Sequence, residues 1–189
     1  IQKHKKFLSL PLSTNDGRSL LEFDFLLMDT KKSRMMAKLF MKYLRSSGKV
    51  HVTTPAGTDM MFYKENRNPG FFNGVLRDGK GYSSSSIEVY VPIEETKTEG
   101  IMVLDGSLGY IGRADEPTRI IFKSGRIVDI EETPTGIRLK KYMEEYFDPR
   151  IYIAGELGIG LNSCSNCLGN CYIEDESAYG TFHVGLGRN

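Results

Sequence analysis

The sequence has no long apolar run, and this absence limits where the protein can reside. None of its uninterrupted apolar stretches approaches the roughly 20 residues that a membrane-spanning helix needs. No signal peptide is recognisable either. A strong excess of charge is also missing, because 25 basic residues face 24 acidic ones, for a net charge of +1. We therefore expect a cytoplasmic protein with no nucleic-acid partner and no membrane partner.

Cysteine is scarce, and its placement excludes a disulfide scaffold. All three cysteines lie in one short segment, Cys164-x-x-Cys167-x-x-x-Cys171. Thiolates at this spacing can bind zinc or an iron–sulfur cluster, but no fourth ligand lies nearby unless His183 supplies it. We favour a polar loop in which the cysteines bind no metal. The sequence also lacks a GxGxxG loop, a Walker loop and a nucleophile elbow.

Short strands separated by turn signals dominate the chain and predict its fold class. A length of 189 residues favours one domain over residues 1–189, with residues 1–19 as an N-terminal arm. Capping residues and apolar residues at helical spacing predict helices from about Thr30 to Ser47 and from about Thr135 to Phe147. We expect an α+β fold with a mixed, largely antiparallel β-sheet and two or three helices.

Three further segments give more specific expectations. Alternating apolar residues predict strands over Leu20–Met28 and Leu108–Ile111. Residues Asn66–Ser86 are rich in Gly, Asn and Ser and predict a long surface loop that contains a hairpin. In the first helix the apolar residues recur at helical spacing, with lysines on the other face, and are expected to face inward. They are Met35, Met36, Leu39, Phe40, Tyr43 and Leu44.

Residues on three separate strand-like segments can together bind a divalent metal. The apolar run Ile151–Ala154 predicts a buried strand that leads to Glu156, and a buried carboxylate needs a partner. His183 and Glu88 lie in two other short strands. Two carboxylates and one imidazole suit zinc, cobalt, manganese or iron. The alternative is that each is an ordinary strand residue, and Glu88 a solvent-facing one, because spacing does not show whether they meet.

Four short motifs follow one another along the chain, and together they resemble a known family. They are Pro55-Ala-Gly-Thr-Asp59, Ile87-Glu88-Val89, Gly155-Glu156-Leu157-Gly158, and Asp175-Glu176-Ser-Ala followed by His183-Val-Gly-Leu-Gly187. In this order, from about Leu20 to the end, they resemble the thermophilic aminopeptidase family, the aminopeptidase T or M29 type of metallopeptidase. The resemblance implies a dinuclear metal site whose ligands include Glu88, Glu156 and His183.

The chain departs from this family in three ways. Ile87 stands where the family usually has Gly. Relatives carry a Tyr and a His-x-Asp pair downstream of the first His, and this sequence ends at Asn189 before either. Relatives also have an additional N-terminal α/β domain. We therefore expect a fragment of a longer enzyme or a shortened member that holds half of the ligand set.

The resemblance implies the metal-dependent removal of N-terminal residues from peptides, by a homodimer. Two metals, zinc or cobalt, would activate water and polarise the scissile carbonyl at a site containing Glu88 and Glu156. A related branch of the fold binds a single iron(II), so a ring-cleaving dioxygenase is a second enzymatic hypothesis. A third, from another class, is a non-catalytic protein on a truncated peptidase fold that binds a peptide along a sheet edge.

Overall fold

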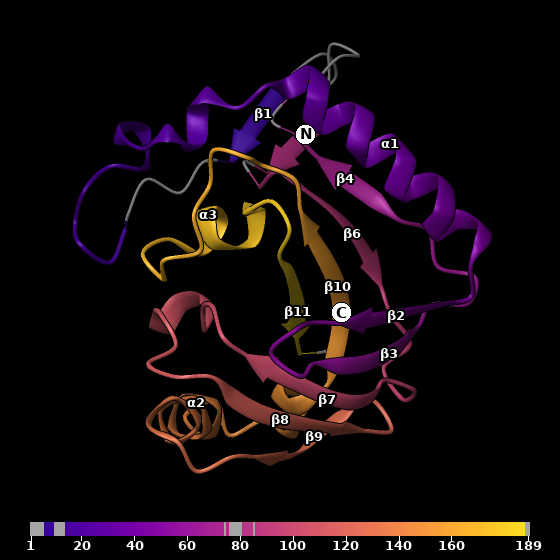
Figure 1. The fold of residues 1–189 in the computed structure, drawn as a ribbon, viewed down its shortest axis with the longest axis vertical. Coiled ribbons are helices and arrows are strands. Elements are labelled where there is room, and N and C mark those ends of the chain that lie inside the picture. Colours follow the sequence, from indigo (N-terminus) through magenta and orange to yellow (C-terminus); the bar gives the residue numbers. More distant parts are fainter. Residues whose placement is uncertain (1–5, 10–13, 74, 76–80, 85, 188–189) are drawn as a thin grey trace.

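Two antiparallel sheets form the centre of the structure (Figure 1). The computed structural model describes residues 6–9, 14–73, 75, 81–84 and 86–187. Within these residues it contains three α-helices, a four-stranded sheet, a five-stranded sheet and one parallel pair of strands. The α+β fold class and the largely antiparallel pairing are thereby confirmed. Parts of two predicted segments, the N-terminal arm and the long loop, lie outside the described residues.

The four-stranded sheet has the order β11-β10-β6-β4, and all its neighbours are antiparallel. Its strands are β4 (Gly70–Phe72), β6 (Glu88–Pro92), β10 (Ala154–Gly160) and β11 (Phe182–Leu186). Strand β4 lies inside the predicted loop over Asn66–Ser86, as does β5 (Gly81–Ser84). Strand β5 pairs in parallel with β1 (Lys6–Ser9), so the hairpin expected within this loop is not how β5 is held.

The five-stranded sheet has the order β2-β3-β7-β8-β9 and is antiparallel throughout. Its strands are β2 (Lys49–Thr53), β3 (Asp59–Tyr63), β7 (Glu99–Leu104), β8 (Thr118–Lys123) and β9 (Arg126–Ile130). Backbone hydrogen bonds join the two sheets at one corner. The amide of Ala154 in β10 donates to the Gly125 carbonyl, in the turn between β8 and β9, at 2.9 Å. The amide of Glu94, which follows β6, donates to the Tyr63 carbonyl of β3 at 2.7 Å.

Two predicted helices are confirmed, and a third is new. Helix α1 (Thr30–Ser46) begins at Asp29, whose side chain accepts hydrogen bonds from two first-turn amides. Helix α2 (Pro134–Glu144) begins at Thr133, whose hydroxyl accepts from the amide of Gly136. The third, α3 (Tyr172–Ser177), is short. No helix within the described ranges is long and apolar enough to cross a membrane.

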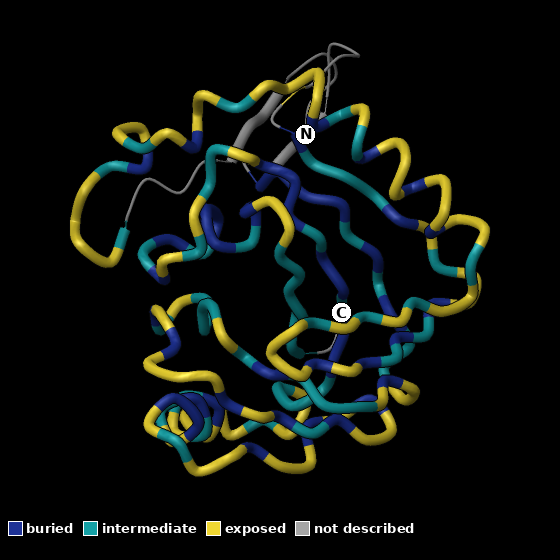
Figure 2. The backbone as a smooth tube through the Cα atoms, in the orientation of Figure 1, coloured by how far each residue is buried: buried dark blue, intermediate teal, exposed yellow. Residues whose placement is uncertain are grey.

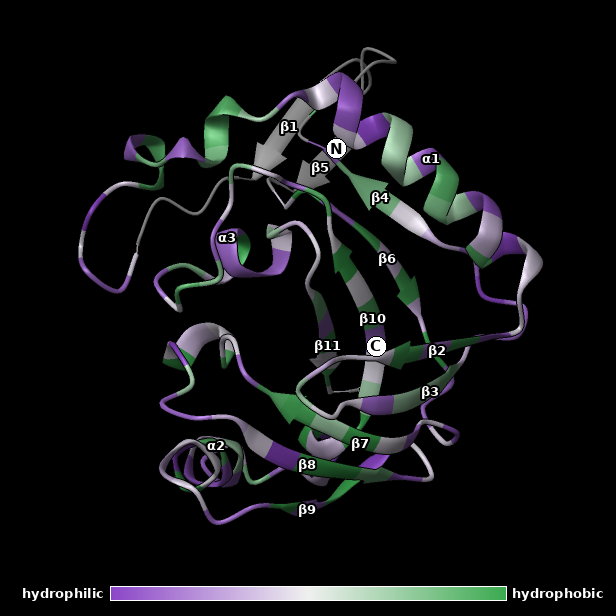
Figure 3. Ribbon diagram, in the orientation of Figure 1, coloured by the Kyte–Doolittle hydropathy of each residue, from purple (hydrophilic) through white to green (hydrophobic). Residues whose placement is uncertain are grey.

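The core lies between α1 and one face of the four-stranded sheet, and it extends into the five-stranded sheet. Val89, Val91 and Leu157 supply fully or almost fully buried side chains on that face. In Figure 3 hydrophobic residues recur along β6 and β8, two of the strands that line this core. Because side chains alternate along a strand, the neighbours of these residues in β6 and β10 point to the other face.

The buried stripe of α1 agrees with the prediction only in part, because Leu44 is buried as expected but several of the other residues are exposed. Ala37, Met41 and Leu44 face the core, and exposed and buried residues alternate along the helix in Figure 2. The expectation that Met35 and Tyr43 face inward is wrong, since they are 73% and 61% exposed. Leu39 is also exposed. Apolar residues occupy both sides of this helix, so spacing alone could not identify the stripe that packs.

Two predicted strands are wrong, because local capping closes tight turns there. Leu20–Met28 instead contains the 3₁₀ helices η1 (Leu20–Glu22) and η2 (Asp24–Leu27). The Ser19 hydroxyl accepts from the Leu21 amide, while the Glu22 carboxylate accepts from the Ser19 amide. Leu108–Ile111 is likewise a 3₁₀ turn, η3 (Gly109–Ile111), between glycines of positive φ at Gly109 and Gly112.

Candidate metal centre

Strands β6, β10 and β11 bring the three predicted ligands onto one face of the four-stranded sheet (Figure 1). Glu88 is paired with Gly160 of β10, and His183 is paired with Gly158 of the same strand. Glu156 precedes Gly158 by two residues. Paired residues and residues two apart share a face of a sheet, so all three side chains point away from the apolar core.

Glu156 is reached by a different path from the one predicted. The expected strand over Ile151–Ala154 is wrong in its first half, because the 3₁₀ helix η4 (Pro149–Tyr152) occupies it. Asp148 begins that turn by accepting a hydrogen bond from the Arg150 amide at 2.9 Å. Strand β10 then starts at Ala154, two residues before Glu156.

Gly158 leaves the space in which His183 and Glu88 meet. A Cβ atom at this position would lie 2.0 Å from His183 Nε2 and 2.8 Å from Glu88 Oε2, closer than carbon contacts allow. The imidazole ring therefore lies across β10 toward the Glu88 carboxylate. A side chain larger than hydrogen would separate the two groups.

The contact between His183 and Glu88 leaves polar atoms without hydrogen bonds. His183 Nε2 and Glu88 Oε2 are 3.0 Å apart, with side chains 23% and 6% exposed. Their alignment is not that of a hydrogen bond, because Glu88 Oε2 is buried without a hydrogen-bond partner among the described residues, as is His183 Nδ1. Such atoms cost about 1–3 kcal/mol each, and a bound cation would compensate Glu88 Oε2.

Glu176 of α3 completes a group of three potential ligands with Glu88 and His183. One ligand atom from each residue lies within 4.8 Å of the others. The hydroxyl of Ser86 donates to Glu176 Oε1, and the Ile87 amide donates to Ser177 Oγ at 2.9 Å. These two hydrogen bonds hold α3 against the start of β6.

Glu176 is the residue that the sequence analysis did not select. It lies in the Asp175-Glu176 motif, which contributes to the family resemblance but was not assigned a metal ligand. This acidic pair was the available signal, because Glu176 lies only seven residues before His183. The short helix that turns Glu176 toward Glu88 was not predicted.

Glu156 lies beside this group but is not one of its three members. Its carboxylate makes no hydrogen bond or ion pair within the described residues. Burial raises its pKa, and the charge of Glu88 adds to that effect, while His183 partly offsets it. The assignment of Glu156 as a metal ligand therefore stays a prediction.

The negative charges of the site also contribute to the shifted pKa values of Glu176 and His183. Burial and then the charge of Glu88 raise the pKa of Glu176 to about 7. Burial by itself lowers the pKa of His183, but the contact with Glu88 and the charges of Glu176 and Glu156 reverse this, so the net direction is upward. Several carboxylates around one imidazole favour a bound cation.

The cysteines do not belong to this group, and the described residues contain no second group of this kind. Burial, followed by the charges of Asp175 and Asp105, raises the pKa of the Cys167 thiol to about 11. Asp175 accepts a hydrogen bond from the Gly169 amide at 2.9 Å, and Glu174 accepts from the Asn166 amide at 3.2 Å. These carboxylates fix the conformation of the cysteine-bearing loop.

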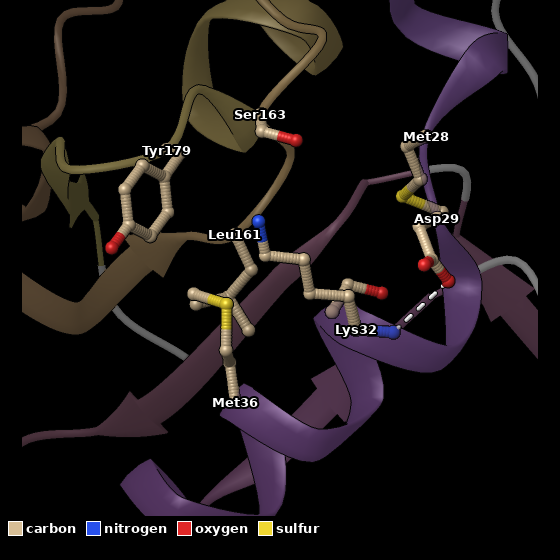
Figure 4. Close-up of a pocket in the computed structure, with 8 residues that line it drawn as sticks. Met28, Asp29, Lys32, Met36, Leu161, Ser163 and Tyr179 are labelled. Carbon is tan, nitrogen blue, oxygen red and sulfur yellow. Dashed lines mark hydrogen bonds between the residues drawn. The ribbon is translucent and has the colours of Figure 1, made fainter.

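A small cavity lies elsewhere, at the start of α1 (Figure 4). Its volume is about 80 Å³, and none of the metal-site residues lines it. Lys32, Met36, Leu161 and Tyr179 contribute to its wall, and Asp29 is occupied there in capping the helix. Sites for drug-sized ligands are commonly several times larger, so this cavity suits a few waters better than a substrate.

Comparisons with known proteins support the fold but not one activity. No protein-family model and no curated protein sequence matches the chain. The structure of 2,5-dihydroxypyridine dioxygenase from Pseudomonas putida KT2440 aligns with a TM-score of 0.72 and 21% identity, over 84% of this chain and 49% of that one. AmpT from Thermus thermophilus aligns with a TM-score of 0.59 and 17% identity, over 85% and 42%.

At these identities the likeness shows a shared fold alone. The chain spans less than half the length of either structure. The fold link to the M29 type is therefore weak.

Proposed function

We propose that this chain carries metal-binding residues of an aminopeptidase-like hydrolase that cleaves N-terminal residues from peptides. The observation that supports this most is the donor set on the site face. It contains the carboxylates of Glu88 and Glu176, the imidazole of His183 and, beside them, the carboxylate of Glu156. A set rich in carboxylates with a single imidazole suits zinc, cobalt or manganese in a hydrolytic site.

The positions of these side chains in the structure support the binding of a divalent metal ion. Three ligand atoms converge within 4.8 Å, and Glu88 Oε2 is buried without a hydrogen bond within the described part of the chain. A metal bound there would act as a Lewis acid on the scissile carbonyl and lower the pKa of a bound water. Peptide hydrolysis at such a site would consume one water, and its products would be the released N-terminal amino acid and the shortened peptide.

The remaining residues have roles around that chemistry. Ser86 orients Glu176 through its hydrogen bond to Oε1, and Gly158 keeps His183 against Glu88. Glu156 lies beside the group, and its carboxylate has no hydrogen bond or ion pair with any described residue. It can therefore hold the protonated amine of a peptide or join the ligand set that the family resemblance implies. Selectivity for a free N-terminus would follow from the first of these roles.

An iron(II) ring-cleaving dioxygenase is the second candidate, favoured by the higher TM-score of 0.72. Non-haem iron oxygenases of this kind commonly use two histidines and one carboxylate. The group found here has one histidine, and His51, the other histidine among the described residues, is an exposed partner of Asp59. Because the group contains one histidine, we rank the hydrolase above the dioxygenase.

Metal binding followed by two activity assays distinguishes these functions. Zinc and cobalt are titrated into the wild-type chain and Glu88→Gln by calorimetry, with Glu144→Gln as an exposed control on α2. We expect micromolar or tighter binding that only Glu88→Gln loses, together with hydrolysis of an amino-acid anilide by the wild type. Turnover of 2,5-dihydroxypyridine with iron(II) and oxygen would favour the dioxygenase. Absence of metal binding would leave a peptide-binding protein on a peptidase frame.

A further inference from the structure

A stacked pair of aromatic rings lies beside the metal centre on the same face of the sheet. Phe72 of β4 is paired with Glu88 of β6, and Tyr90 lies two residues further along β6. The two ring centroids are 4.9 Å apart, and the ring planes differ by 21°. Paired residues of neighbouring antiparallel strands have Cβ atoms about 5 Å apart. The Phe72 side chain therefore starts on the strand next to the one that carries the candidate ligand Glu88.

This aromatic pair is not part of the hydrophobic core. Phe71, the neighbour of Phe72, points to the opposite face and packs against the core, where Val89 and Val91 are fully buried. Phe72 and Tyr90 belong neither to the buried core nor to the apolar residues packed against it, and both remain half-buried. Their partly exposed surface is available to a ligand.

The backbone of β4 fixes the position of the Tyr90 ring. A Cβ atom at Gly70 would lie 2.5 Å from Cζ and from the hydroxyl oxygen of Tyr90, so the outer end of the ring lies directly over this glycine. The hydroxyl makes no hydrogen bond within the described residues.

We propose that Phe72 and Tyr90 form a platform for the aromatic side chain of a substrate's N-terminal residue. The polar atoms of that residue would face the metal centre, and its ring would extend toward β4. This inference rests on the proposed peptidase function. An offset aromatic pair contributes about 0.5–1.5 kcal/mol beyond area burial, which predicts a preference of roughly two- to twelvefold over an aliphatic residue.

Binding can be followed by the fluorescence of a tryptophan-containing probe, because the protein itself contains no tryptophan. The probe is the dipeptide Trp-Gly with its peptide bond reduced to an amine, so that it cannot be hydrolysed. Its fluorescence reports binding without a tryptophan signal from the protein, and the Leu-Gly analogue is measured by competition. The variants are Phe72→Leu and Tyr90→Leu, and Phe71→Leu is the control on the opposite face. Each titration is run with zinc and with a chelator, after circular dichroism has confirmed folding.

We expect the wild type and Phe71→Leu to prefer the tryptophan probe, and Phe72→Leu and Tyr90→Leu to lose that preference. Equal affinity of the wild type for both analogues, or binding of neither, would overturn the platform. So would a loss as large in Phe71→Leu as in Phe72→Leu. Zinc binding without aromatic preference rejects the platform alone. A preference that persists in a protein that binds no zinc rejects the metal function and keeps the platform.

Discussion

Replacing Glu176 with Gln tests whether the negative charges of the site destabilise the folded protein when no metal is bound. The pKa of this carboxyl in the folded protein is about 7, against an ordinary value of 4.5. The folded state therefore binds the proton more tightly than the unfolded chain does. As the pH rises from about 4.5 through 7, the unfolded chain releases the proton first, so the free energy of unfolding falls over this window.

The size of the effect follows from the difference between the two pKa values. A difference of 7 − 4.5, or about 2.5 pH units, at 1.36 kcal/mol per unit, corresponds to a loss of about 3 kcal/mol above pH 7. This is an upper value, because Glu176 shares its proton with neighbouring carboxylates. Glutamine has nearly the same shape and can still accept the Ser86 hydrogen bond, but it does not ionise.

We expect Glu176→Gln to be more stable than the wild type at pH 8 in chelator, and about equal to it near pH 4.5. With zinc at 1,000 times its Kd the order should reverse, because the ligand then stabilises the wild type by about 4.1 kcal/mol, which exceeds the loss of about 3 kcal/mol. Urea unfolding followed by circular dichroism measures all of these states, with Glu144→Gln as the control. A variant that is less stable than the wild type at pH 8 in chelator would refute the reasoning.

Three further substitutions test the frame of the site. Gly158→Ala should displace the His183 ring and weaken zinc binding about tenfold or more in calorimetry, and unchanged affinity would contradict the packing described for that glycine. Ser86→Ala removes a hydrogen bond that lowers the pKa of Glu176, so the pH midpoint of zinc binding should rise; a lower midpoint would reverse the inferred sign. Thr133→Ala removes the α2 cap and should cost about 1 kcal/mol in urea unfolding while leaving zinc affinity unchanged.

Elements with strong local signals could be predicted from the sequence, and those decided by capping could not. Helix α1 follows from the Asp29 cap and from helical spacing, and the structure confirms both. Leu20–Met28 alternates like a strand, yet the reciprocal Ser19 and Glu22 hydrogen bonds close it into a 3₁₀ turn. A pattern of apolar residues does not reveal which of two local hydrogen-bond arrangements is more stable.

The residues of the candidate metal centre also divide into those that could be predicted from the sequence and those that could not. Glu88 and His183 could be selected because each lies in a short strand bordered by motif residues, and the structure brings them to 3.0 Å. Their meeting depends on strand order and on the absent side chain of Gly158, and neither is visible in local spacing. Glu176 was missed because its orientation depends on hydrogen bonds from Ser86 and Ile87, ninety residues away in sequence.

The short helix α3 has a consequence for the rates at which an ion would enter and leave. Glu88 and His183 are held by strands with several ladder hydrogen bonds, whereas Glu176 belongs to a six-residue helix whose start has no side-chain cap. A short helix has few backbone hydrogen bonds of its own, and such segments open more often than sheets do. Opening of α3 would remove one ligand and leave the other two in place. The lifetime of a bound ion would then be set by fraying of α3, and affinity and exchange rate could be tuned separately.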